Sequence, residues 1–225
     1  MSTELAAKSF ASVSSLVGLQ LFSRAFTFIL NQALVRIASP EVFGTATIQF
    51  ELLLSTILFL SREGVRNTLL RSKKAGLSGG NPPSRQLFTN VSLIPILLGA
   101  PLSLCAAFAY CTLSSSDTRA QSHFDSAVGI YAVAAFFELL SEPLYARAQN
   151  ELRLDVRVRA EGAAVVCKAL VSVSALMYAG KGWSLVAFAA GQLAYGTAVL
   201  GVYLLEFRGW GGVGLRRVNI DVHGK

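Results

Sequence analysis

The chain has 225 residues, of which 53% are hydrophobic and only 15% are charged. A soluble domain carries about a quarter charged residues, and the apolar residues here gather in long blocks, so an ordinary soluble globular domain is excluded. Twenty Lys and Arg against thirteen Asp and Glu give a formal net charge of +7. The distribution of that charge decides between a nucleic-acid surface and a membrane topology.

Six apolar blocks are long enough to cross a membrane, for which roughly 20 mostly apolar residues are needed. The sequence therefore predicts an all-α fold, a polytopic membrane bundle of six transmembrane helices. The first block is too long for a signal peptide and contains Gln20, Arg24 and Asn31. The bundle is expected to occupy residues 1–207, with residues 208–225 as a short basic cytosolic tail. The predicted spans are 12–36, 41–61, 87–113, 126–146, 160–180 and 183–206.

The basic residues lie almost entirely on one side of this topology. Fifteen of the twenty Lys and Arg fall in the N-terminal segment, in the loops after the second and fourth spans, and in the tail. Arg36, Arg119 and Lys181 fall on the other side, and Arg24 and Lys168 lie within spans. Because cytosolic loops carry the excess of Lys and Arg, both termini are predicted to be cytosolic. The net charge thus indicates topology and not nucleic-acid binding.

Polar residues recur on one face of several predicted spans. At about 100° per residue, Gln20, Arg24, Thr27 and Asn31 form a narrow stripe on the first span. Such a stripe on an apolar helix marks the side that faces away from lipid. The further stripes are Glu51, Ser55 and Arg62 on the second span, Glu138 and Glu142 on the fourth, Arg157, Glu161, Lys168 and Ser172 on the fifth, and Gln192 with Tyr195 on the sixth.

Charges deep in the bilayer cost roughly 2.5–3.5 kcal/mol each on insertion scales, so they face a bundle interior or a wet cavity. Arg24, Glu51 and Lys168 lie near the middle of their spans, and Glu138 lies somewhat nearer the cytosol. Two interpretations are open: these groups neutralise one another and fix helix packing, or they line a hydrophilic cavity for a polar or anionic headgroup. Water is expected to reach the outermost members, Glu142, Glu161 and Arg157.

Catalytic chemistry has little support in the sequence. His123 and His223 have no Cys or carboxylate cluster at metal-ligand spacing, and the GxSxG, P-loop and HExxH motifs are absent. Glu138 and Glu142 are suited to acid–base work, but no neighbouring residue supplies a nucleophile or an activated water. We therefore expect a protein that is not an enzyme and uses no cofactor or metal.

Five stretches in order carry a family resemblance: LQLFSRAFTFILNQALVRIASPEVFG (19–44), ELLLSTILFLSREGVRNTLLR (51–71), FELLSEPLYARAQN (137–150), RVRAEGAAVVCKAL (157–170) and FAAGQLAYG (188–196). Together they resemble the Rft family of endoplasmic-reticulum proteins of oligosaccharide–lipid translocation. That family is grouped with the multidrug/oligosaccharidyl-lipid/polysaccharide exporters.

The resemblance implies that the chain moves dolichol-diphosphate-linked Man5GlcNAc2 from the cytosolic to the lumenal leaflet of the endoplasmic reticulum, for protein N-glycosylation, as a flippase or a flippase-associated protein. Two alternatives stay open. One is a membrane scaffold or regulator of the same pathway. The other is an ion-coupled small-molecule antiporter with Glu51 or Glu138 as the proton site.

Residues of the expected substrate path follow from the stripes and the resemblance together. Arg62, Arg66 and Arg157 are expected at the cytosolic mouth, where guanidinium groups suit a diphosphate. The chain matches only the first of two helical bundles in the family, so a missing C-terminal half or a second copy is expected as partner. The resemblance carries over the family's motif positions, which are Arg24, Asn31, Arg36, Glu51, Arg62, Glu63, Arg66, Glu138, Glu142, Glu161, Lys168 and Gln192. The substrate-path candidates are Arg24, Asn31, Glu51, Arg62, Arg66, Glu138, Glu142, Arg157, Glu161, Lys168 and Gln192.

Overall fold

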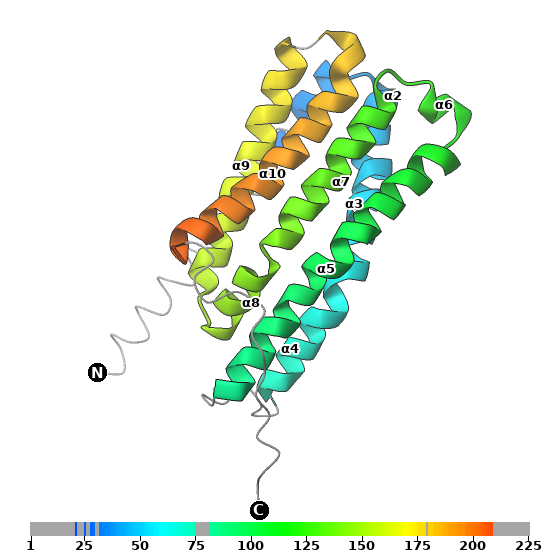
Figure 1. Ribbon diagram of the computed structural model, residues 1–225. Coiled ribbons are helices and arrows are strands. Elements are labelled where there is room, and N and C mark those ends of the chain that lie inside the picture. Colours follow the sequence, from blue (N-terminus) through cyan, green and yellow to red (C-terminus); the bar gives the residue numbers. More distant parts are fainter. Residues whose placement is uncertain are drawn as a thin grey trace, which may run out of the picture.

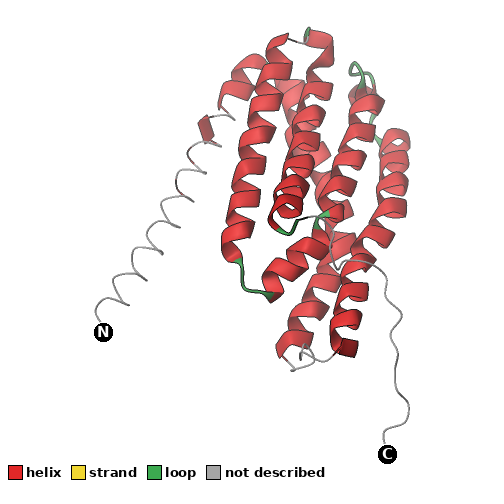
Figure 2. Cartoon of the chain, turned by 60° about the vertical axis from the view of Figure 1, so that its left-hand side comes forward, coloured by secondary structure: helices red, strands yellow, loops and turns green. Residues whose placement is uncertain are grey.

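Long helices packed side by side make up the described part of the chain (Figure 1). The computed structural model describes residues 21, 25, 28–29, 32–74, 82–178 and 180–208. No strand occurs in these ranges, and the described connections between helices are short (Figure 2). The predicted all-α class is confirmed. The predicted first span lies mostly outside the described residues, as do Arg24, Asn31 and the tail from residue 209.

Five described helical segments are long and apolar enough to cross a membrane. They correspond to the second to sixth predicted spans, with ends that differ by several residues. They are Pro40–Leu69, Leu87–Leu113, Phe124–Asn150, Leu154–Tyr178 and Ser184–Glu206.

The second span is a chain of helical pieces. Ser39 caps its start, accepting a hydrogen bond from the Val42 amide, and Pro40 follows in the first turn. Two π-helical turns, which often mark functional positions, interrupt the α-helix before and after its central piece. The pieces are α2 (Pro40–Gly44), η1 (Thr45–Gln49), α3 (Phe50–Leu58), η2 (Phe59–Glu63) and α4 (Gly64–Lys74).

The rest of the chain runs back and forth beside this helix. At one end of the bundle α4 lies near α8, and at the other α2 lies near α6 (Figure 1). The elements are α5 (Pro82–Leu113), α6 (Ser116–Arg119), α7 (Phe124–Leu140), α8 (Glu142–Asn150), α9 (Leu154–Tyr178), η3 (Lys181–Trp183) and α10 (Ser184–Glu206).

A break divides the fourth span into α7 and α8. The α7 helix ends at Leu140, and Pro143 follows in the first turn of α8. Proline has no N–H to continue the ladder of hydrogen bonds, and the Ser141 hydroxyl donates to the Glu138 carbonyl at 2.6 Å. Glu138 and Glu142 consequently lie in different helices on the two sides of the break, although the sequence places them one turn apart.

Packing around α7 and α10 forms the frame of the site. Phe50 of α3 lies against Tyr131 of α7, with ring centroids 4.8 Å apart, and both are buried. The α10 helix packs against α7 on one side and α9 on the other. A Cβ added at Gly191 would lie 2.9 Å from the Lys168 carbonyl oxygen, and one at Gly196 would lie 2.9 Å from that of Ala134. Two glycines therefore permit the close approach of α10 to its neighbours.

Candidate functional site

A cavity of about 680 Å³ lies among the second span, α7, α9 and α10. This volume falls within the roughly 300–1,000 Å³ typical of small-molecule pockets. Leu34, in the segment before α2, also lines the cavity. Residues of the stripes predicted on four spans meet at this cavity. Its polar lining consists of Thr47, Glu51, Ser55, Arg62, Glu63, Tyr131, Glu138, Lys168, Ser172, Gln192 and Tyr195.

Glu138 is the buried carboxylate of the cavity. Its exposed fraction is 7%, and that of Gln192 on α10 is 2%. The Gln192 Nε2 group donates a hydrogen bond to Glu138 Oε1 at 2.8 Å, and Arg62 Nη1 lies 3.9 Å from Glu138 Oε2. A buried charge is stable only when it has partners of this kind. These contacts join α7 to α10 and to the second span.

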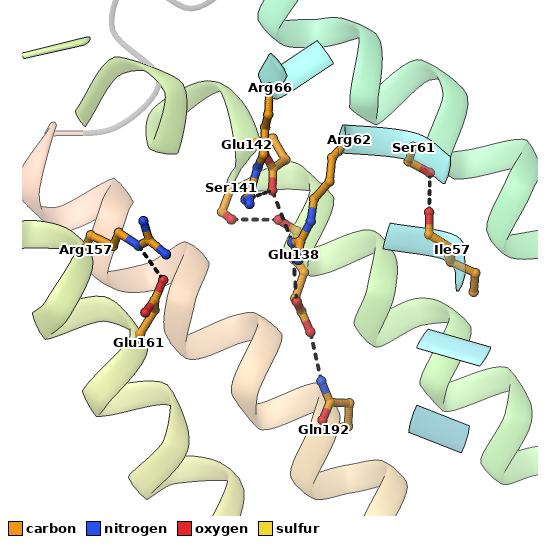
Figure 3. A network of polar contacts seen from close by, with 10 residues as sticks. All are labelled: Ile57, Ser61, Arg62, Arg66, Glu138, Ser141, Glu142, Arg157, Glu161 and Gln192. Carbon is orange, nitrogen blue, oxygen red and sulfur yellow. Dashed lines mark hydrogen bonds and ion pairs between the residues drawn. The ribbon is translucent and has the colours of Figure 1, made fainter. Parts of the chain in front are cut away.

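Glu142 is the centre of a second group of contacts, next to the first (Figure 3). Its carboxylate accepts from Arg66 Nε at 2.8 Å and from Arg66 Nη2 at 2.6 Å, a bidentate pair. Arg62 Nη1 also donates to it, at 3.3 Å. The prediction that water reaches Glu142 is wrong, because its exposed fraction is 3%. The break before α8 places it facing α4, inside the bundle.

Arg62 connects the two carboxylates. It belongs to the π-helical turn η2 and contacts Glu138 and Glu142, each across the bundle. Its Nε is buried and has no hydrogen-bond partner within the described part of the chain. The formal charges of Arg62, Arg66, Glu138 and Glu142 cancel, so the group is neutral with nothing bound. Arg62 nevertheless retains unused N–H donors at the edge of the cavity.

A third ion pair crosses the cavity from α9 to α3. Lys168 Nζ lies 3.7 Å from Glu51 Oε2, and both side chains are partly exposed. This contact joins two of the four charges that the sequence places in the middle of the membrane. The pair is looser than the bidentate pair of Arg66, since a distance of 3.7 Å exceeds that of a charge-assisted hydrogen bond.

Arg157 and Glu161 lie apart from the cavity. Their side chains pair with each other at 2.8 Å along one face of α9 and are about half exposed. Neither lines the cavity. The Arg157 guanidinium nevertheless lies over the Tyr145 ring at 5.4 Å, and that of Arg66 lies over the same ring at 4.0 Å. Arg157 is therefore near Arg66, although it does not line the cavity.

The predicted substrate-path residues thus separate into three sets. Glu51, Arg62, Glu138, Lys168 and Gln192 line the cavity. Arg66 and Glu142 adjoin it through Arg62, and Arg157 and Glu161 lie outside it. Arg24 and Asn31 lie outside the described residues.

Sequence reasoning missed Tyr131, which is buried and lines the cavity. It lies within an apolar run of α7, so it carries no polarity signal of its own. Its spacing of seven residues from Glu138 places both on one helix face and is the signal that could have found it. In the described ranges, no three His, Cys, Asp or Glu side chains lie close enough together to hold a metal ion.

Comparison with known proteins gives one consistent family. The sequence model of the family described as "Rft protein" matches residues 8–211. The chain is 34% identical over 224 residues to the Man(5)GlcNAc(2)-PP-dolichol translocation protein RFT1 of Eremothecium gossypii, covering 91% of this chain and 40% of that protein. The protein of the same name from Dictyostelium discoideum is 31% identical over 189 residues, covering 84% and 34%.

A mammalian relative shows the same pattern. The protein of that name from Mus musculus is 28% identical over 192 residues, covering 84% of this chain and 34% of its own length. The chain therefore spans between about a third and two fifths of these three relatives. No solved structure matches the chain.

Proposed function

The chain belongs to the Rft family, and on this premise we propose that it forms one lobe of a glycolipid transporter. The proposed substrate is dolichol-diphosphate-linked Man5GlcNAc2, moved from the cytosolic to the lumenal leaflet of the endoplasmic-reticulum membrane for protein N-glycosylation. The names of the relatives state Man(5)GlcNAc(2)-PP-dolichol translocation, which supports the substrate. The chain acts as a transport protein in this proposal, without catalytic chemistry.

The observation that carries the proposal is a cavity whose polar lining comes from four spans. A glycolipid transporter must offer the headgroup a polar path while the polyprenyl chain stays in hydrocarbon. Charged groups at the membrane midplane mark such paths. The cavity is lined by Glu51, Lys168, Glu138 and Gln192, which provide donors and acceptors for sugar hydroxyls.

Arg62 is the residue we assign to the diphosphate. A guanidinium has five N–H donors in a planar fork that fits phosphate oxygens. In the described part of the chain Arg62 makes one hydrogen bond, at 3.3 Å, and its Nε is unpartnered. The Nε is buried, but Arg62 lines the cavity, so we assign the anion to the terminal N–H groups of its guanidinium.

The direction of loading follows from the proposed orientation. If the excess of Lys and Arg marks the cytosol, α4 and α8 lie at the cytosolic end and the turn around α6 lies at the lumenal end. Arg62 and its neighbours then lie toward the leaflet in which the substrate starts. We propose a multi-pass protein with both termini cytosolic.

A second lobe completes the transporter in this proposal. The chain spans 31% to 40% of the length of the first curated relatives it matches. Transporters built from helical repeats bind at the interface between the repeats and alternate access by rocking. We therefore propose that the corresponding second half, or a second copy of this chain, closes the cavity.

The experiment that tests the function uses proteoliposomes containing fluorescent dolichol-diphosphate oligosaccharide, with the chain alone and with the second half of a relative. Translocation is measured as loss of lectin accessibility on one face. We expect Arg62→Gln to reduce the rate at least tenfold and Arg157→Gln, in the exposed pair, to leave it within twofold. If the translocation rate in protein-free vesicles equals the rate with the chain alone and with the chain plus the second half, the chain is not a transporter, and the scaffold is favoured.

A second candidate, an ion-coupled small-molecule antiporter, is favoured by one feature. Glu138 is a carboxylate buried within the cavity, the arrangement that proton relays use. A pH gradient across the vesicles separates the two candidates. Uptake that requires the gradient and is abolished by Glu138→Gln favours the antiporter, whereas gradient-independent glycolipid movement favours the proposed function.

A further inference from the structure

The guanidiniums of Arg62 and Arg66 have unequal partners. Arg66 binds both oxygens of Glu142, at 2.8 and 2.6 Å, and lies over the Tyr145 ring at 4.0 Å. Arg62 makes a longer hydrogen bond of 3.3 Å to the same carboxylate and lies 3.9 Å from Glu138. Arg66 is therefore held by two short hydrogen bonds and an aromatic ring, whereas Arg62 is held more loosely. The two residues are both basic and one helical turn apart, but only Arg62 lines the cavity.

The carboxylate of Glu142 accepts from an Nη1 donor of Arg62 that an anionic ligand of this residue could use. It is 3% exposed and lies at the start of α8. Carboxylate and phosphate oxygens compete for the same N–H groups of a guanidinium. An incoming diphosphate therefore competes with Glu142 for the positive charge of Arg62 and, at Nη1, must replace the contact with Glu142.

We propose that Glu142 is a positioning residue that competes with the diphosphate of the substrate for Arg62. The inference rests on the proposed function. Without substrate, Glu142 neutralises the half-buried guanidinium of Arg62. With substrate, phosphate oxygens replace Glu142 as acceptor, and on release Glu142 contacts Arg62 again. A transport site must bind well enough to load and weakly enough to release, and an internal competitor provides this balance.

Arg66 has an indirect role in this exchange. Its bidentate pair fixes the Glu142 carboxylate and draws part of its negative charge away from Arg62. If Arg66 loses its charge, Glu142 has Arg62 as its remaining cationic partner in the described part of the chain and holds it more firmly. Arg66 thus promotes anion binding without contacting the anion.

Binding of inorganic pyrophosphate to the purified chain in detergent, measured by isothermal titration calorimetry, tests the competition. Removing the Glu142 charge leaves a net positive group around Arg62, so we expect Glu142→Gln to bind on the order of fivefold more tightly than the wild type. Glu142→Asp keeps the charge and should remain within twofold. Arg62→Gln should abolish binding, and Arg66→Gln should weaken it several-fold. Arg157→Gln is the matched control and should have no effect.

The double variant Arg66→Gln/Glu142→Gln separates an indirect role of Arg66 from direct contact. It removes one positive and one negative charge, so it leaves no unpaired buried charge and remains informative if a single variant fails to fold. With the competitor gone, binding should return to the wild-type affinity or exceed it. Binding as weak as in Arg66→Gln alone would show that Arg66 contacts the anion and would overturn the proposal.

A lipid arm identifies the source of the diphosphate. If the site binds the diphosphate of a prenyl lipid, farnesyl diphosphate should displace bound pyrophosphate at a lower concentration than unlabelled pyrophosphate does. Displacement at equal concentrations indicates a site for free diphosphate. In proteoliposomes, Glu142→Gln should lower both the KM for glycolipid and the maximal rate, since release becomes slow. If the affinity for pyrophosphate depends on Arg62 but is unchanged or lower in Glu142→Gln, the proposed competition is wrong and the proposed function is unaffected. Wild-type and Arg62→Gln chains that bind pyrophosphate equally contradict both.

Discussion

Gln192 of α10 donates a 2.8 Å hydrogen bond to Glu138 of α7, across 54 residues of sequence, and both side chains are buried. Replacing Gln192 by Leu keeps similar bulk but leaves the Glu138 carboxylate with the more distant Arg62. We expect a loss of about 1–3 kcal/mol in the free energy of unfolding, the usual cost of an unsatisfied buried polar group. Thermal or SDS unfolding in detergent measures it.

Thr197→Val is the control for this variant, because it changes a polar residue of the same helix. The Thr197 hydroxyl donates only to carbonyls of its own helix, at 3.0 Å, and is exposed. Its stability should stay within 0.5 kcal/mol of the wild type, about the range of surface substitutions. Equal losses in the two variants would show that the Glu138–Gln192 contact does not stabilise the bundle.

Gly191 and Gly201 of α10 should respond in opposite directions to alanine. A Cβ at Gly191 would lie 1.9 Å from the Ser172 hydroxyl oxygen and 2.9 Å from the Lys168 carbonyl, so α9 and α10 must move apart. At Gly201 no atom lies within 4 Å, and alanine gains up to about 1 kcal/mol in helix propensity. We expect a lower melting temperature for Gly191→Ala and an equal or higher one for Gly201→Ala. A stable Gly191→Ala chain would mean that this contact between helices is absent.

The Glu51–Lys168 pair predicts a specific cross-link. In a chain without Cys105, Cys111 and Cys167, the pair Glu51→Cys/Lys168→Cys should react with a short bifunctional thiol reagent, because the charged atoms lie 3.7 Å apart. Glu51→Cys/Val166→Cys is the control, since Val166 lies on another face of α9 and does not line the cavity. Cross-linking is read as a mobility shift of the chain after proteolysis between α3 and α9. Equal yields in both pairs would contradict the cavity.

The proposed topology predicts opposite labelling of the two ends of the bundle. Ser122→Cys precedes α7 at one end, and Leu152→Cys lies between α8 and α9 at the other. In sealed microsomes, a membrane-impermeant maleimide should label Leu152→Cys from outside and Ser122→Cys only after permeabilisation. Both sites are exposed, so access reports sidedness. The reverse pattern would invert the proposed direction of loading.

How far the site could be predicted depends on the kind of residue. Glu51, Arg62, Glu138, Lys168 and Gln192 carry a polar signal at helical spacing, and each of them lines the cavity. Their partners could not be assigned, because depth and angle on an isolated helix do not fix which helices are neighbours. The pairing of Glu138 with Arg62 and Gln192, for example, depends on how α7 packs between its neighbours.

The membrane class, the positions of the five described spans and the polar face of each could be predicted from local quantities: the length of an apolar block and the 3.6-residue period of a helix. The burial of Glu142 against Arg66, 76 residues away, and the position of the Arg157–Glu161 pair outside the cavity depend instead on how the helices pack. The break at Ser141 and the π-helical turns η1 and η2 redirect side chains from an ideal helix. A charge buried in a bundle is stable only where such a partner lies within reach.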